Sequence, residues 1–111
     1  MQYNENNVPV DVTVWAYAYH SPHSMFNIKP VAGKVITKRV KVQDCAMEFK
    51  EFHYCDSDGR KAFSNVHNLL FADTEREATD GYNKLVLQRI RKINKMLEDV
   101  VSDYILGFNR R

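Results

Sequence analysis

Two pairs of residues in this chain have side chains that could hold a metal ion. His20 and His23 lie three positions apart, and His53 and Cys55 lie two apart, with Cys45 as a further thiol. Zinc needs three or four such groups converging on one point. A proline separates the first two histidines, which predicts a loop, and neither pair has a familiar zinc spacing. We therefore expect exposed loop histidines and ordinary strand residues here, with no metal.

The same thiol and imidazole groups could serve as a nucleophile and its base. However, nothing in the local sequence places Cys55 at a helix N-terminus, where a thiol has a lowered pKa and is more reactive. The surrounding carboxylates form no recognisable acid–base pair and suit a solvated strand face and turn; they are Glu48, Glu51, Asp56 and Asp58. We predict that the protein is not an enzyme and uses no cofactor.

Basic and aromatic residues form a third set, with chemistry suited to nucleic acid. No acidic residue occurs between Val12 and Gln43, and the region from Tyr82 to Leu97 is equally basic. The candidate contacts are Lys34, Lys38, Arg39, Lys41, Arg89, Arg91, Lys92 and Lys95, with Trp15, Tyr17 and Tyr19 as stacking groups. Aromatic side chains on a sheet face can stack single-stranded bases. The alternative is that the basic residues are solvated and that the aromatic residues are covered by a helix. The net charge of +2 does not decide between these two interpretations.

Strands must position these aromatic and basic residues. Apolar and polar residues alternate over 8–19, which predicts a strand with Val14 on one face and with Trp15, Tyr17 and Tyr19 on the other. Further strands are expected over 30–42, 46–55 and 60–64. The alternation slips near 37–39, which suggests a bulge, a bend or two short strands, and near 50–51, which suggests a bulge or a strong bend. Asp58-Gly59 predicts a hairpin turn, and 65–71 is either a short strand or a helical turn. The result is four to five strands in a strongly bent antiparallel sheet, a half-barrel.

A long helix is predicted over 74–106. Thr74 and Glu77 fit a capping box, in which the Thr74 hydroxyl accepts from the Glu77 amide and the Glu77 carboxylate accepts from the Thr74 amide. Gly107 suits the position just after a helix. Apolar residues recur at steps of four and three along one stripe: Val86, Ile90, Ile93, Leu97, Val100 and Tyr104. Such a stripe is typical of a helix that packs on a core. Gly81 costs about 1 kcal/mol relative to alanine.

The length of this helix exceeds what the sheet can cover. About thirty residues at about 1.5 Å each give roughly 45 Å. A compact domain of this size is only about 35 Å across. Either the helix breaks, at Gly81 or Asn94, or its overhang packs on a partner, for which a second copy is the simplest choice.

Composition predicts a single domain over 1–111 with a loose arm at 1–7, a sheet region at 8–71 and the helix at 74–106. A hydrophobic content of 44% supports a real core. The polar start has no secretory signal, and no apolar run is long enough to span a membrane. Two cysteines without a signal favour reduced thiols and a cytoplasmic location.

Two stretches carry a resemblance to known proteins. The segment 70–78, followed by 81–86, resembles the capped C-terminal helix of small accessory proteins from large tailed phages. The segment 29–35 resembles the strand entry of SH3-like or KOW-type small barrels. The resemblance implies a protein that modulates a host protein or nucleic-acid complex in the host cytoplasm, and it transfers no functional residue.

These observations favour a small α+β protein that modulates or inhibits a host macromolecule by protein–protein contact, as a homodimer or with another protein. The alternative is a nucleic-acid-binding small barrel that uses its basic strand and helix faces.

Overall fold

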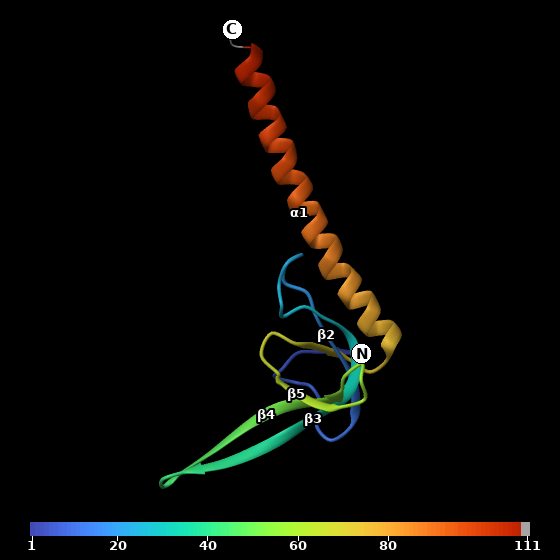
Figure 1. Ribbon diagram of the computed structural model, residues 1–111, viewed down its shortest axis with the longest axis vertical. Helices are drawn as coiled ribbons and strands as arrows, with labels where there is room; N and C mark the ends of the chain where they lie inside the picture. The colour runs from blue at the N-terminus through green and yellow to red at the C-terminus, as the bar shows by residue number, and fades with distance from the viewer. Residues whose placement is uncertain (110–111) are drawn as a thin grey trace.

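The computed structural model describes the backbone of residues 1–109 and the side chains of residues 1–104. In this part of the chain, six strands are followed by one helix (Figure 1). The elements are β1 (Gln2–Tyr3), β2 (Thr13–Ala18), β3 (Ile28–Val42), β4 (Cys45–Cys55), β5 (Lys61–Asn65), β6 (Leu70–Ala72) and α1 (Glu75–Asn109). The predicted α+β class with a long C-terminal helix is confirmed.

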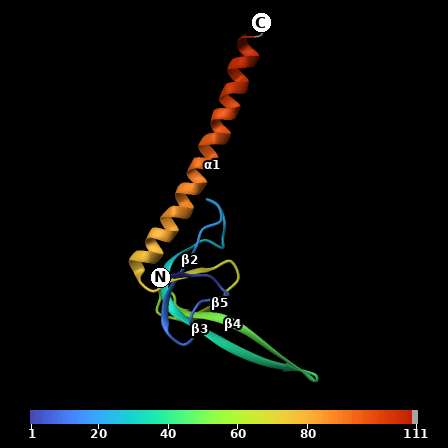
Figure 2. The same ribbon diagram turned by 180° about the vertical axis from the view of Figure 1, so that it is seen from behind.

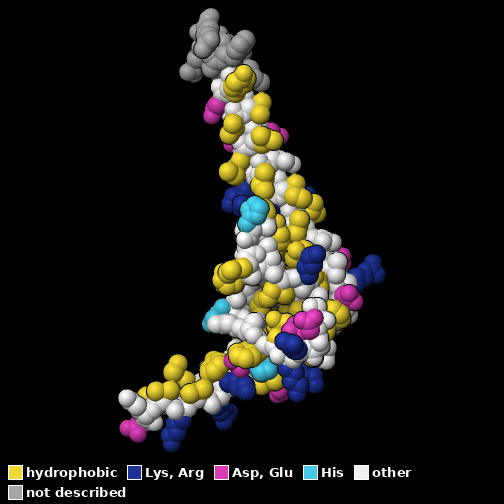
Figure 3. Space-filling view, in the orientation of Figure 1, with side chains coloured by type: hydrophobic (Ala, Val, Ile, Leu, Met, Phe, Trp, Pro, Cys, Tyr) yellow, Lys and Arg dark blue, Asp and Glu magenta, His cyan; other side chains and the backbone are white. Residues whose placement is uncertain are grey.

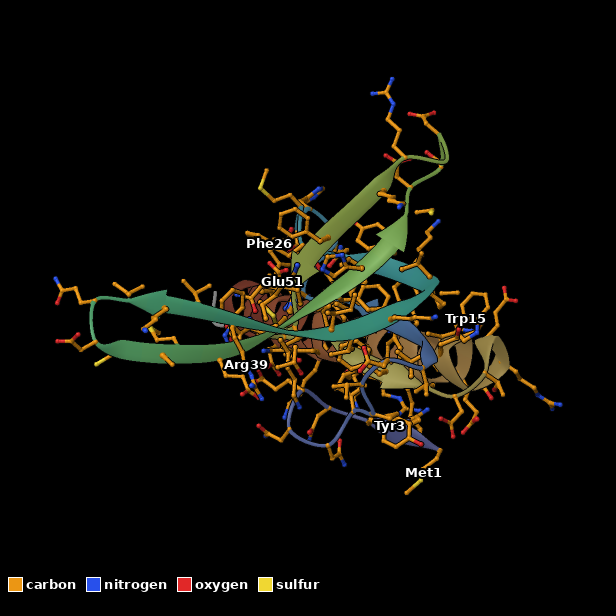
Figure 4. All side chains as sticks on the ribbon, turned by 90° about the horizontal axis from the view of Figure 1, so that it is seen from below. Met1, Tyr3, Trp15, Phe26, Arg39 and Glu51 are labelled. Carbon is orange, nitrogen blue, oxygen red and sulfur yellow. The ribbon has the colours of Figure 1, made fainter. Side chains whose placement is uncertain are left out.

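All strands belong to one antiparallel sheet in the order β1-β6-β2-β3-β4-β5. The sheet is open, with β1 and β5 at its edges, and it is strongly twisted (Figure 4). It has six strands, where four to five were predicted. The additional strand comes from the predicted loose arm, because Gln2 pairs with Ala72 and Tyr3 with Phe71. The ambiguous segment after Asn65 supplies its partner, β6.

The apolar core lies on one face of this sheet. Val14, Val35, Phe52 and Phe71 are fully buried there, and the rings of Phe52 and Phe71 lie 5.7 Å apart. Val8, Val66 and Leu69 join the same cluster from the connecting loops. The start of α1 packs on the other face, over β2, β3 and β6.

Strands β3 and β4 form a ribbon that projects from the sheet (Figure 1). Their pairing runs without a shift from Gly33–Tyr54 to Val42–Cys45. Neither slip is therefore a bulge, and β3 is one strand and not two. The outer part of the ribbon is exposed on both faces, and no buried face there dictates the alternation of apolar residues. The register shift lies in β2, between Ala16 and Ala18.

The N-terminus of α1 is held by a cap and by the start of the chain. As predicted, Thr74 Oγ1 accepts a hydrogen bond from the amide of Glu77, at 3.2 Å. The Glu77 carboxylate does not reach back to the Thr74 amide as predicted; it accepts from the Thr74 hydroxyl at 3.1 Å and from the amino group of Met1. Met1 also lies 3.4 Å from the Asp73 carboxylate, so β1 and the helix start are joined.

The helix neither breaks nor bends back onto the sheet. It runs through Gly81 and Asn94 and continues past Gly107 to Asn109, so the predicted end at 106 is three residues short. Arg110 and Arg111 lie outside the described residues. The molecule measures 71 × 37 × 28 Å, and its radius of gyration of 19.8 Å exceeds the value of about 13 Å for a compact chain of this size. The distal part of α1 therefore extends away from the sheet (Figures 1 and 2).

Candidate protein-binding surface

The proximal part of α1 is the part that packs on the sheet. Ala78 and Gly81 are buried, while Tyr82, Leu85 and Arg89 are half-buried. From Ile90 to Tyr104 every residue of the helix is exposed. The contact between helix and sheet is therefore confined to the first four turns of α1.

The three aromatic residues proposed as a base-stacking face lie at this contact. Tyr17 is 2% exposed, and burial raises the pKa of its hydroxyl. Trp15 is half-buried and packs on the cluster of Tyr17, Ala72 and Ala78 (Figure 4). Tyr19 meets Tyr82 of α1 edge to face, with ring centres 5.7 Å apart. The helix thus covers most of the surface that bases would need.

The basic residues fall into two separate groups. Lys34, Lys38, Arg39 and Lys41 lie on β3, and Arg39 forms an exposed ion pair with Glu48 at 3.3 Å. Arg91, Lys92 and Lys95 lie on the distal part of α1 and are exposed, whereas Arg89 is half-buried. The ribbon and the distal helix point toward opposite ends of the molecule, so these groups do not form one continuous basic face (Figure 3).

The histidines and cysteines of the sequence are also dispersed. Among the described residues, no three of the His, Cys, Asp and Glu side chains come together in a group that could hold a metal ion. His53 Nε2 lies 3.2 Å from Glu51 Oε1, and its ring stacks on Phe63. Cys45 and Cys55 are free thiols at opposite ends of β4.

The distal part of α1 carries a long exposed apolar surface. Its central stripe, here called the distal stripe, consists of Val86, Ile90, Ile93, Leu97, Val100 and Tyr104. The exposed fraction is 46% for Ile90, 59% for Leu97 and 64% for Val100. Leu87, Met96 and Val101 flank the stripe and are also exposed (Figure 3). The stripe was assigned by pattern to the core. The structure leaves its residues from Ile90 to Tyr104 exposed, while Val86 is half-buried.

The distal stripe is turned partly away from the face of α1 that packs on the sheet. Successive helix residues are rotated by about 100°. On that basis the centre of the stripe is turned by roughly 70° from the centre of the face on which Ala78, Tyr82 and Leu85 pack. A partner bound to the stripe would therefore lie beside the sheet and would not displace the sheet from α1.

A smaller apolar surface occupies one face of the β3–β4 ribbon. Cross-strand partners share a face, which brings together Val40, Val42, Met47 and Phe49. All four are exposed. Lys38 and Cys45 interrupt this surface, so it is less continuous than the distal stripe.

The described part of the chain contains no helix long and apolar enough to cross a membrane. No protein-family model, no curated protein and no solved structure matches this chain.

Proposed function

We propose that this is a non-enzymatic binding protein that acts through protein–protein contact, with the distal stripe of α1 as its contact surface. One observation carries the proposal: a helix patterned to bury one face leaves that face exposed from Ile90 to Tyr104. Exposed apolar patches of this kind, rimmed by charged residues, are typical of protein interaction sites.

The composition of the surface supports a protein partner. Aliphatic and aromatic side chains form the stripe, and charged residues lie beside it, as in the core and rim of protein interfaces. A nucleic acid would instead be bound by clustered cations and accessible aromatic residues. Here the cations are divided between two ends of the molecule, and Tyr17 is buried beneath α1.

The resemblance to accessory proteins of tailed phages supports the same class of function. Such a protein would modulate a host macromolecule by occupying part of its surface. The stretch that carries the resemblance, 70–86, forms β6 and the proximal turns of α1, which fix the direction in which the distal stripe projects.

Site-specific photo-crosslinking tests this proposal. A benzophenone amino acid is placed at Leu97 on the stripe or at Ser102 on the other side of the helix. Both proteins are irradiated pure and in bacterial lysate. We expect a discrete protein adduct from position 97, lost on Val100→Asp, and none from position 102. Equal labelling from both positions, or no adduct from position 97, would overturn the proposal.

A further inference from the structure

Charge along the distal part of α1 is divided into two blocks. The first is basic and has no acidic residue; it contains Lys84, Arg89, Arg91, Lys92 and Lys95. The second is acidic and has no basic residue up to Asn109; it contains Glu98, Asp99 and Asp103. The apolar stripe runs through both blocks. A partner for the stripe must therefore be apolar along its centre. It must also place acidic residues beside the basic block of α1 and basic residues beside the acidic block.

A second copy of α1 meets that requirement when it runs in the opposite direction. In a parallel pair, the five cations of one helix would lie beside the same five of the other, and like charges repel. In an antiparallel pair, each basic block lies beside an acidic block. We propose that the distal stripe pairs with that of a second copy as an antiparallel two-helix dimer. This rests on the proposed function, because it names the partner of the same surface.

The spacing of the stripe fits one antiparallel register throughout. When Ile93 lies opposite Leu97 of the second copy, Ile90 lies opposite its Val100. The same register places Val86 opposite Tyr104 of the second copy. Since the pair has two-fold symmetry, each contact occurs twice, and all six stripe residues are used with none left unpaired.

The flanking residues agree with this register. On one side, Arg89 lies beside Asp103 of the second copy, an opposite-charge pair formed twice. The buried Nε of Arg89 has no hydrogen-bond partner within the part of the chain that the structure describes. On the other side, the exposed Leu87 lies beside Val101 of the second copy. Charge and apolar packing thus select the same alignment independently.

The two-fold axis passes near residue 95, the midpoint of the stripe. There Asn94 and Met96 each lie near their own equivalents in the second copy. A polar residue in the seam of a helix pair is a known means of fixing register. The two sheets then lie at opposite ends of the helix pair, because each is attached to the proximal end of its own helix.

Cysteine crosslinking distinguishes the two orientations. The background is Cys45→Ser with Cys55→Ser, which removes both exposed thiols. Val86→Cys and Tyr104→Cys are each treated with a short bismaleimide, alone and after refolding together. Circular dichroism and the solution mass confirm that each variant is folded and report its oligomeric state.

We expect no crosslinked dimer from either variant alone, since residue 86 and its equivalent are about 27 Å apart along an antiparallel pair. The mixture is expected to give a covalent heterodimer. Dimers from each variant alone would overturn the antiparallel orientation. A monomeric mass would overturn the second copy as partner, while a photo-adduct from position 97 with a different protein would leave the proposed function standing.

Discussion

The ring of Tyr17 on β2 lies directly against the backbone of Gly81 in α1, with no space for a side chain between them. A Cβ atom at position 81 would come within 3.0 Å of the Tyr17 ring. Gly81 is poor for helix propensity, yet it lets the helix lie on a fully buried tyrosine. This contact fixes the distance between α1 and the sheet, and therefore the direction in which the distal part of α1 extends.

Gly81→Ala is expected to destabilise the protein despite its better helix propensity. Alanine gains about 1 kcal/mol in a helix, while forcing a methyl group into a packed contact costs about 1–3 kcal/mol. We expect the free energy of unfolding in urea to fall by about 1 kcal/mol. Thr79→Ala, at an exposed position of the same helix, should instead raise it slightly. A more stable Gly81→Ala protein would show that the Tyr17 contact is not tight.

Thr74→Ala is expected to lower the free energy of unfolding by about 1 kcal/mol, because the amide of Glu77 loses its hydrogen-bond acceptor. Thr74→Ser keeps the hydroxyl and should remain near wild type. Chemical denaturation measures both. Equal stability of the alanine and serine variants would contradict the role of the cap.

The contact between Met1 and Glu77 predicts a pH dependence with two limbs. The hydrogen bond from the Met1 amino group holds the pKa of Glu77 below its usual value of 4.5. The same bond raises the pKa of the amino group above 8.0. The carboxylate contributes stability above its unfolded pKa and loses it as pH falls through the lowered folded value. The amino group contributes stability below pH 8.0, its unfolded pKa, and this stability is lost as the pH rises through the raised folded pKa.

Glu77→Gln should therefore flatten the pH dependence of stability on both limbs. Thermal melting from acidic to alkaline pH measures this effect. Glu75→Gln removes a carboxylate from the same helical turn and should leave the alkaline limb unchanged. Identical profiles for the two variants would show that the ion pair does not contribute in solution.

The partial burial of Trp15 predicts weak access from solvent. Iodide should quench its fluorescence less in the native protein than in urea, and single-stranded DNA at low salt should leave it unchanged. Trp15 is the single tryptophan, so the signal is unambiguous. Quenching by DNA that weakens steeply with added salt would favour the nucleic-acid alternative.

Local signals in the sequence predicted the parts of the fold that depend on local chemistry. The Thr74 cap, the Asp58-Gly59 turn with Gly59 at φ 77°, and the alternation of β2 are examples. By contrast, β1 has only two residues and pairs with distant β6, so no local pattern marks it. Tyr17 was correctly placed on the face opposite Val14, but only the packed helix shows that it is buried.

The candidate surface was harder to predict for a physical reason. An apolar stripe at steps of four and three has the same pattern whether it covers its own sheet or a partner. Leu97 and Leu85 look alike in sequence, yet Leu85 packs beside Tyr17 and Leu97 is 59% exposed. The length of the helix was the one signal that separated them.

The mass in solution tests the central claim most directly. Leu97→Asp places a charge in the centre of the distal stripe, and Ser102→Asp adds the same charge on the other side of the helix. By sedimentation equilibrium we expect wild type and Ser102→Asp at twice the 13.0 kDa of one chain, and Leu97→Asp at 13.0 kDa. A wild-type protein that stays at 13.0 kDa at every concentration, or a Leu97→Asp variant that stays dimeric, would contradict the account.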